Sequence, residues 1–419
     1  MMETKEKLVP KLRFPEFDDE WKKSTLKKEL KSYKLGGNYS NTEKITDRPL
    51  IKMGNLGRGG ITLDKIQYIE NSEKVEDVDE IKNGDLFFNT RNTLDLVGKV
   101  AIWRGELPLA YFNSNLMRLM FSNNFFMNYR LNSYQGLKSL KRYATGTTSV
   151  AAIYTRDLLK VKVTVPNLDE QQKIASFLSA VDQKINQLQR KKELLQAYKK
   201  GMMQQLFSQQ LRFNPAQSGV EGDENGNDFP EWEEYRLKDI LIDYKLGGNY
   251  KNSESITEKP LIKMGNLGRG NISLDKVQYI TDGEEIDNND LIEYGDLFFN
   301  TRNTLELVGK VAIWKNELPI AYYNSNLMRL KFENNFFMNY RLNSYEGIKG
   351  LKKYATGTTS VAAIYTRDLL KLKLNLPCLE EQSKIASFLS ALDAKIDTVS
   401  TAITQTQDFK KGLLQQMFV

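Results

Sequence analysis

The organisation of this chain follows from a stretch that it contains twice: Gly84-Asp85-Leu86-Phe87-Phe88-Asn89-Thr90-Arg91-Asn92-Thr93 recurs unchanged at residues 295–304. Tyr33–Tyr39 and Tyr143–Val150 recur with the same offset of 211, at residues 244–250 and 354–361. No gap is needed over roughly 190 residues, and about four in five positions match between Gly84 and Pro166. The repeat is far longer than the ~20–50 residues of a solenoid unit, so we predict one module present in two copies.

Each copy begins with a globular part of mixed character. Short apolar runs between Gly, Asn and Pro turns read as strands, and Val161–Val165 alternates apolar and polar residues as a half-exposed strand does. We expect a helix over Asn123–Tyr143, broken near Gly136. An α+β domain follows. The expected strands lie within Ile61–Ile69, Gly84–Thr90, Lys99–Trp103, Leu109–Phe121 and Val161–Val165.

The pattern of residues changes after Pro166. From Asp169 to Gln209 there is no proline, and apolar residues recur every three or four positions for about five heptads. This period predicts a coiled-coil helix of ~40 residues, roughly 60 Å long. Lys192, Lys199 and Lys410 are polar positions in the seam, expected to fix its register. The seam positions begin with Ile174, Leu178, Val181 and Ile185 in the first copy and Ile385, Leu389, Leu392 and Ile396 in the second.

Like modules that associate about a twofold axis pair their helices antiparallel. We therefore predict two globular α/β domains separated by two long helices in an antiparallel, pseudo-twofold coiled coil. The predicted segments are a first domain at 1–166, a central helix at 167–212, a polar linker at 213–229, a second domain at 230–376 and a C-terminal helix at 377–419.

The composition excludes several classes of enzyme. The chain has 419 residues, a formal charge of +7, one cysteine and no histidine. Ser-His-Asp triads and His-ligated metal sites are therefore impossible, as are disulfides within the chain. Without an apolar leader or an 18-residue apolar run, we expect no signal peptide and no membrane contact. The single cysteine is compatible with a reducing cytoplasm.

No reaction signature is found. There is no P-loop motif and no Pro-Pro pair such as a base-methylating loop requires. Asp85 follows Gly84 and is interpreted as a turn residue, because position 97 is valine where a metal nuclease would need an acid. Cys378 is Asn167 in the first copy, so it is interpreted as an incidental thiol.

Amide, hydroxyl and cationic side chains instead gather in expected loops, where such groups match base edges and phosphates. Taken singly, each cluster could be a solvated loop, and the Gly54–Gly60 loop could be a plain turn. The candidate DNA-binding residues of the first copy are Lys34, Asn38, Tyr39, Lys52, Asn55, Arg58, Asn89, Thr90, Arg91, Asn92, Lys141, Arg142, Thr145, Thr147 and Thr148. Those of the second copy are Lys245, Asn249, Tyr250, Lys263, Asn266, Arg269, Asn300, Thr301, Arg302, Asn303, Lys352, Lys353, Thr356, Thr358 and Thr359.

The layout resembles the specificity subunit of Type I restriction–modification systems. The resemblance covers the whole chain and is carried by Pro10–Phe17 with Trp21, by Phe229–Trp232, and by a doubled block. That block is Gly146-Thr147-Thr148, Leu158, Val165-Pro166, Glu170-Gln171, Ile174, Leu178, Asp182 and Ile185, with its repeat starting at Gly357.

The resemblance implies a non-catalytic protein with two target-recognition domains, each reading half of a split site in double-stranded DNA. The helices would set the unread spacer and dock two methyltransferase subunits, which bring S-adenosylmethionine. Restriction subunits, where the system has them, bring ATP and Mg²⁺. The family's two domains usually differ strongly, whereas these are near twins, so we expect a palindromic or nearly palindromic target.

Two other readings stay open from the sequence: a coiled-coil scaffold for proteins, and a self-sufficient enzyme. For the partner subunits we expect contacts at the exposed apolar positions of the helices, namely Phe177, Leu194, Phe207, Phe388 and Phe418.

Overall fold

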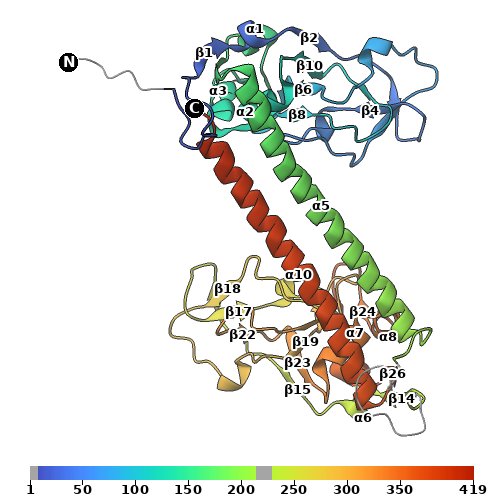
Figure 1. The fold of residues 1–419 in the computed structure, drawn as a ribbon. Helices are drawn as coiled ribbons and strands as arrows, with labels where there is room; N and C mark the ends of the chain where they lie inside the picture. The colour runs from blue at the N-terminus through green and yellow to red at the C-terminus, as the bar shows by residue number, and fades with distance from the viewer. Residues whose placement is uncertain (1–7, 214–228) are drawn as a thin grey trace. The chain divides into compact units, whose positions relative to one another are not determined.

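The computed structural model describes residues 8–213 and 229–419. The chain divides into two compact units: unit 1 contains residues up to Gln189 together with Ser400–Val419, and unit 2 contains Arg190–Val399. Each unit thus holds one globular part and a portion of both long helices, α5 (Leu168–Phe207) and α10 (Leu379–Gln416) (Figure 1). The compact units therefore divide the chain differently from the predicted segments, which gave each helix a segment of its own. Most of the predicted linker lies outside the described residues.

The globular part of each unit has the same order of elements, as the repeat predicts. In unit 1 these are β1 (Lys22–Thr25), α1 (Leu26–Glu29), β2 (Ser32–Leu35), β3 (Asn41–Thr42), β4 (Pro49–Ile51), β5 (Gln67–Ile69), β6 (Leu86–Asn89), β7 (Arg91–Asn92), β8 (Val100–Ile102), β9 (Tyr111–Phe112), β10 (Leu116–Met120), α2 (Asn124–Asn132), α3 (Tyr134–Lys141), β11 (Thr145–Gly146), β12 (Ala151–Ala152), α4 (Thr155–Leu158) and β13 (Lys162–Val165).

In unit 2 they are β14 (Glu233–Arg236), α6 (Leu237–Ile240), β15 (Asp243–Leu246), β16 (Asn252–Ser253), β17 (Pro260–Ile262), β18 (Gln278–Ile280), β19 (Leu297–Asn300), β20 (Arg302–Asn303), β21 (Val311–Ile313), β22 (Tyr322–Tyr323), β23 (Leu327–Lys331), α7 (Asn335–Leu342), α8 (Tyr345–Lys352), β24 (Thr356–Gly357), β25 (Ala362–Ala363), α9 (Thr366–Leu369) and β26 (Lys373–Leu376). The mixed helix and sheet confirm the predicted α+β class.

The repeated stretch forms the centre of the main sheet. In unit 1 this antiparallel sheet has the order β2-β10-β6-β8, and all four residues of β6 are buried. Because neighbouring strand residues point to opposite faces, Leu86 and Phe88 enter one core and Phe87 the other. The first core lies against α2 and the long helices. The second lies against the sheet β3-β5-β4-β9. A strand buried on both faces explains the unbroken apolar run.

The helix expected over Asn123–Tyr143 is indeed broken, but at Ser133 and not near Gly136. The Ser133 side chain accepts a hydrogen bond from the Gly136 N–H and so caps α3. Gly136 lies inside α3, where an added Cβ would come within 2.2 Å of the Arg130 carbonyl oxygen. Glycine is therefore needed for close packing of the two helices. Of the strand expected within Ile61–Ile69, only Gln67–Ile69 forms.

Within each unit the two long helices pack through the predicted apolar seam. In unit 1, Ile174, Leu178, Val181 and Ile185 of α5 share a core with Leu413 and Met417 of α10. Beyond Met417, Phe418 contacts the rings of Trp21 and Phe126, with centroids 6.1 and 5.8 Å away. The end of one long helix therefore completes the globular core beside the beginning of the other, so the two run in opposite directions.

A carboxylate next to the seam joins three elements of unit 1. Asp182 of α5 accepts hydrogen bonds from Arg104, at 2.9 Å, and from the Tyr129 hydroxyl of α2, at 2.8 Å. Lys410 of α10 lies 2.5 Å from its other oxygen. In unit 2, Asp393 of α10 is bound in the same way by Tyr340 and by Lys199 of α5. The seam lysines Lys410 and Lys199 thus have fixed acidic partners, as a role in register requires.

A second carboxylate anchors the segment that precedes each globular part. Glu170 is fully buried and accepts hydrogen bonds from the Arg13 guanidinium, at 2.7 and 2.8 Å, and from the Trp21 indole, at 3.2 Å. In unit 2, Glu381 is bound likewise by Arg212 and Trp232. Arg13 and Arg212 are 199 positions apart, not 211, so the repeat offset alone does not pair them.

Among the described residues, neither long helix nor any other helix is apolar enough over a sufficient length to cross a membrane.

The Glu170 contacts predict a large loss of stability for Glu170→Ala. Glu170 is fully buried and the Arg13 side chain is mostly buried, and removal of one partner from a buried ion pair typically costs about 3–5 kcal/mol. Chemical denaturation followed by tryptophan fluorescence should show a correspondingly lower midpoint. Glu193→Ala is the control, because Glu193 pairs with Arg190 on the exposed face of α5 and should change stability by less than about 1 kcal/mol. Equal midpoints for the two variants would contradict the assignment.

Candidate nucleic-acid interface

Two of the predicted clusters are brought together by a small sheet in each unit. In unit 1 its order is β11-β12-β7, with Ala152 of β12 opposite both Thr145 of β11 and Arg91 of β7. Arg91 and the whole stretch Thr145–Val150 are exposed. The cationic strand and the hydroxyl-rich hairpin, 54 residues apart in sequence, therefore form one surface.

The hairpin between β11 and β12 is held rigidly by its own hydroxyl groups. Thr147 N–H donates to the Val150 carbonyl, at 2.8 Å, and Val150 N–H donates to Thr147 Oγ1, at 3.2 Å. Gly146 has φ +130°, and an added Cβ would lie 2.3 Å from the Val150 oxygen. The turn leaves Thr148 and Ser149 exposed at its tip.

A pocket of about 330 Å³ opens beside Arg91. Its lining includes Arg91 and Thr90, which were predicted, and Asn115 and Tyr154, which were not. Tyr154 is 53% exposed. Residues 113–115 form a turn, in which Leu116 N–H donates to the Asn113 carbonyl. The ten lining residues are Leu35, Thr90, Arg91, Ser114, Asn115, Met117, Ala152, Ile153, Tyr154 and Thr155.

All ten positions are identical in the second copy. The only sign of Tyr154 in the sequence was this identical recurrence as Tyr365, which a duplication preserves at most positions. The counterparts in unit 2 are Leu246, Thr301, Arg302, Ser325, Asn326, Met328, Ala363, Ile364, Tyr365 and Thr366.

Arg58 and Lys99 form a second cationic position in unit 1. The Arg58 guanidinium donates to the Asp95 carbonyl, at 3.1 Å, and partial burial lowers its pKa. Burial, and after it the charge of Arg58, lower the pKa of Lys99, so the two cations lie near each other. Neither has an ion pair within residues 8–213 and 229–419, the part that the structure describes. Arg269 and Lys310 repeat the arrangement.

An uncompensated pair of cations is suited to a phosphate group. Lys99 was not singled out from the sequence as a DNA contact, because its proximity to the Gly54–Gly60 loop comes only from the fold.

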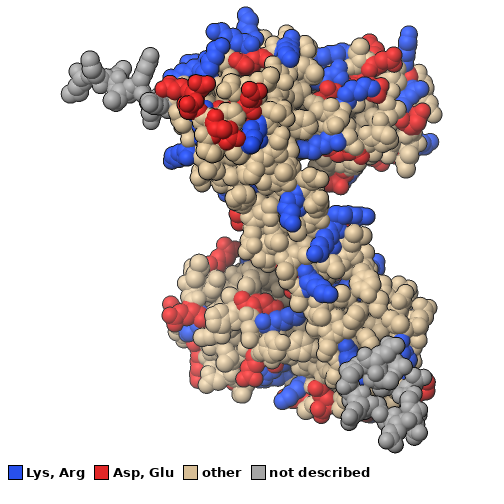
Figure 2. Space-filling model, in the orientation of Figure 1, with Lys and Arg blue, Asp and Glu red and all other residues tan. Residues whose placement is uncertain are grey.

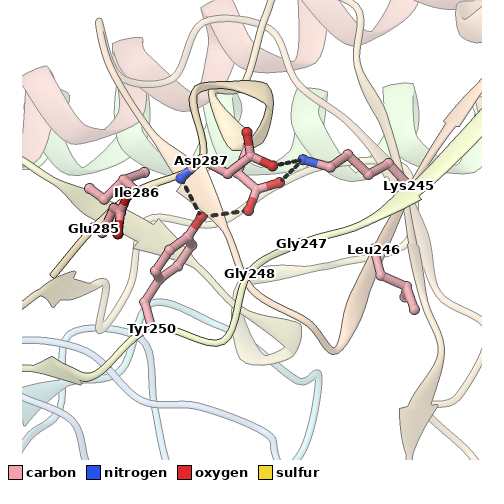
Figure 3. A pocket seen from close by; sticks show the side chains of 9 residues that line it. Lys245, Leu246, Gly247, Gly248, Tyr250, Glu285, Ile286 and Asp287 are labelled. Carbon is pink, nitrogen blue, oxygen red and sulfur yellow. Dashed lines mark hydrogen bonds and ion pairs between the residues drawn. The ribbon is translucent and has the colours of Figure 1, made fainter.

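The cluster of Lys34, Asn38 and Tyr39 has a different character. Its counterpart in unit 2 lines a cleft of about 460 Å³. There Lys245 Nζ lies 2.7 Å from Asp287 (Figure 3) and 2.6 Å from a carboxylate oxygen of Asp290. The Tyr250 hydroxyl donates to Asp290 at 2.6 Å, and burial together with this bond raises the pKa of Tyr250 to about 12.

In unit 1, Lys34 and Tyr39 contact Asp79 in the same way. The charge of each lysine is therefore balanced by carboxylates within its own unit, which weakens its attraction for phosphate. Asn38 and Asn249 remain exposed.

Several predicted amides are wrong as DNA contacts, because they lie inside the domains. Asn89 and Asn300 are 0% exposed. Asn55 is also buried and donates to the Thr62 and Asp64 carbonyls, and Asn266 is its equivalent.

Other predicted residues already form hydrogen bonds within their own units. Lys52 donates to Asn41 and Gln67, Thr90 donates to the Asn115 carbonyl, and Asn92 accepts from Thr93 N–H. Lys263, Thr301 and Asn303 repeat these contacts. The predicted residues left exposed are Asn38, Arg58, Arg91, Lys141, Arg142, Thr145, Thr147, Thr148 and their counterparts Asn249, Arg269, Arg302, Lys352, Lys353, Thr356, Thr358 and Thr359.

Two of the five predicted partner contacts are wrong, because they lie in the core of their own units. Phe207 and Phe418 are buried. Phe177 lies edge-on to Phe14, and Phe388 lies edge-on to Phe213. Only Leu194 is exposed, at 53%. Phe177 and Phe388 are half-buried, so their role as partner contacts stays a prediction.

Each α+β domain thus presents an exposed arginine, a hydroxyl-rich hairpin and a cation pair, which are groups suited to binding DNA. The chain matches the family described as Type I restriction modification DNA specificity domain twice, over residues 19–196 and 230–406. It belongs to this family and is a DNA target-recognition subunit of a Type I restriction–modification system. The scaffold reading is not favoured.

Curated relatives and solved structures of Type I specificity subunits are similar to this chain. The putative type I restriction enzyme MjaX specificity subunit of Methanocaldococcus jannaschii is 27% identical over 421 residues, 98% of this chain and 95% of the relative. The MjaVIII specificity subunit of the same organism is 27% identical over 290 residues, 66% of each chain.

The crystal structure of the S subunit of a Type I system from M. genitalium shares the fold, with a TM-score of 0.62 at 16% identity, covering 98% of this chain and 99% of the other. A chain in a structure of the type I R-M system titled for complex assembly and conformational transition has a TM-score of 0.50 at 15% identity, covering 94% and 96%.

The cation pair predicts how Arg58→Ala combined with Arg269→Ala affects DNA binding. Affinity should fall for every sequence alike, and the slope of log K against log salt should become shallower by about one per lost phosphate contact, or ~2 in total. Fluorescence anisotropy between about 50 and 200 mM salt measures this. The control is Lys160→Ala with Lys371→Ala, since these exposed lysines are already paired with Asp157 and Asp368. An unchanged slope would exclude a phosphate contact.

Proposed function

We propose that the globular part of each unit reads one half of a bipartite site in double-stranded DNA. We further propose that the two half-sites are the same sequence in inverted orientation. The observation that carries this proposal is the identity of all ten residues lining the pocket beside Arg91 and beside Arg302. Domains with the same reading groups recognise the same bases, and a twofold arrangement of two such domains reads an inverted repeat.

The proposed base contacts centre on Arg91 in unit 1 and on Arg302 in unit 2. An arginine pairs bidentately with guanine O6 and N7, which gives ~1–3 kcal/mol of discrimination. The hairpin hydroxyls Thr147 and Thr148 and the cation pair of Arg58 and Lys99 are assigned to phosphates, which position the protein without specifying sequence.

Catalysis is assigned to partner subunits, since the chain has no histidine and none of the reaction motifs sought. We propose that two methyltransferase subunits dock on the long helices and bring S-adenosylmethionine, and that restriction subunits, where present, bring ATP and Mg²⁺. The helices then set the length of the unread spacer, and the complex works in the cytoplasm.

The proposed symmetry has a test in the methylation pattern. A genome expressing this subunit with its methyltransferase should carry methylated adenines in two copies of one half-site, inverted about a spacer of fixed length. Single-molecule sequencing of that DNA measures the pattern. Small differences between the two globular parts can relax the sequence preference at single flanking base pairs. Among them are Gly60 against Asn271, Lys44 against Ser255 and Lys74 against Glu285. Two unrelated half-sites would refute the proposal.

The division between base and phosphate contacts predicts two kinds of variant. Arg91→Ala with Arg302→Ala should bring affinity for the cognate site closer to that for scrambled DNA, by about 10-fold or more per half-site. Lys141→Ala with Lys352→Ala should weaken both and mainly flatten the salt dependence. Competition binding of the assembled complex to cognate and scrambled duplexes separates the two. Equal losses on both duplexes for the arginine variant would remove Arg91 from base readout.

A further inference from the structure

The first strand and helix of the two globular parts share a fold but not a sequence. Residues 22–32 of unit 1 and 233–243 of unit 2 agree at only three of 11 positions. In unit 1, β1 pairs with β13 and leads into α1, and in unit 2, β14 pairs with β26 and leads into α6. The buried leucine that begins each short helix, Leu26 or Leu237, is retained. Most of the side chains that differ are on the surface.

The charge of this segment has opposite signs in the two units. Residues 22–32 contain five cations and one anion, a net charge of +4, whereas residues 233–243 contain two cations and four anions, a net charge of −2. The exposed residues of segment 22–31 are its five lysines alone, and we refer to them as the lysine face: Lys22, Lys23, Lys27, Lys28 and Lys31. Their counterparts in unit 2 are Glu233, Glu234, Lys238, Asp239 and Ile242.

The lysine face carries an unbalanced positive charge. Within residues 8–213 and 229–419, none of its five members forms an ion pair with a carboxylate. Figure 2 shows lysine and arginine side chains gathered over β1 and α1, which Figure 1 labels. In unit 2 the corresponding acidic side chain of Glu234 instead pairs with Lys373 of β26, at 2.7 Å.

Helix α4 connects the lysine face to the pocket beside Arg91. The Lys27 N–H donates at 3.1 Å to the carbonyl of Leu159, the residue that follows α4. Thr155, at the start of α4, lines the pocket, and the next residue, Arg156, has a side chain that is 82% exposed. Exposed cations therefore continue from the pocket to α1.

Strand β2 gives the distance between the two surfaces. Lys31 precedes β2, and Leu35 at the other end of this strand lines the same pocket. Four residues of extended chain span ~13 Å. At 3.4 Å per base pair, this corresponds to ~4 base pairs along a duplex.

The composition of the lysine face indicates the kind of partner. Lysine is depleted from protein interfaces, whose centres are apolar and aromatic, and segment 22–31 exposes no apolar side chain. Unpaired lysines suit phosphate oxygens, because their binding releases the counterions of a nucleic acid. The lysine face therefore fits a DNA backbone better than a protein surface.

We propose that the lysine face contacts phosphates of the duplex about four base pairs from the bases that unit 1 reads, and that unit 2 makes no equivalent contact. The inference rests on the proposed function, in which both units bind one duplex. It adds that two units with the same pocket residues hold their half-sites unequally. Unit 1 gains a salt-dependent contact that is indifferent to sequence, whereas Glu233, Glu234 and Asp239 of unit 2 repel the backbone.

The first test gives unit 1 the acidic residues of unit 2. Lys22→Glu, Lys23→Glu and Lys28→Asp together, in the assembled complex, should make the slope of log K against log salt shallower by about two to three. The ratio of affinities for cognate and scrambled duplexes should stay within about twofold of the wild type, because phosphate contacts carry no sequence information. Fluorescence anisotropy measures both. Glu233→Lys, Glu234→Lys and Asp239→Lys together should make the slope steeper.

The second test locates the contact on the DNA with duplexes in which neutral methylphosphonates replace phosphates about three to five base pairs from a half-site. If the target is symmetric, modification beside one half-site should change affinity by no more than about twofold, because the complex binds in the other orientation. Modification beside both half-sites should weaken binding by about 10-fold or more. The charge-reversed variant of unit 1 should lose this sensitivity. With two unrelated half-sites, modification beside only one of them should weaken binding, which would support this inference and refute the proposed symmetry.

The control is Lys22→Arg, Lys23→Arg and Lys28→Arg, which keeps the charge and should leave the slope unchanged, and circular dichroism verifies that every variant is folded. An unchanged slope in the charge-reversed variant of unit 1 would overturn this inference and leave the proposed function intact. Loss of partner subunits from that variant, with the slope unchanged, would identify a protein as the occupant and also overturn it. A wild-type complex that binds no DNA would overturn both the inference and the proposed function.

Discussion

One carboxylate beside the helix seam of each unit holds three elements in place. Asp182 is only 14% exposed in its side chain and receives an arginine from the globular part, a tyrosine hydroxyl from α2 and a lysine from the other long helix. Because a partly buried charge is costly without partners, these contacts fix the helices in register and the globular part on top of them. Asp393 repeats this in unit 2, with Lys315 in place of the arginine, at 3.8 Å.

The sequence was sufficient for the organisation of the chain and insufficient for its surface. An exact repeat and a heptad period are properties of the chain itself, so the doubled module and the seam from Ile174 onward could be predicted. Whether Asn89 reaches solvent depends on the strands packed around it. Residue type alone does not distinguish a buried asparagine from an exposed one. The pairing of Arg13 with Glu170 likewise required the fold, since the second copy obtains its arginine at a different offset.

The sequence was also insufficient to show which apolar residues of the long helices are exposed. Phe177 and Phe388 are apolar residues on a long helix, and from the period alone they seemed unpartnered. Phe14 and Phe213 pack edge-on against them and leave them half-buried, and these two residues belong to segments without regular structure that carry no periodic signal. Exposure, and not hydrophobicity, separates Leu194 from them. Leu194 is thus the predicted partner residue that the structure leaves most exposed.

The place of Phe418 in the core of unit 1 has a consequence for synthesis of the chain. Unit 2 is one continuous stretch, Arg190–Val399, and all its residues are available once Val399 has been made. Unit 1 surrounds it in sequence, and its aromatic cluster of Trp21, Phe126 and Phe418 lacks one ring until Phe418 has left the ribosome. Since domains generally fold as units during translation, the half of the protein that is made first is the half that finishes folding last.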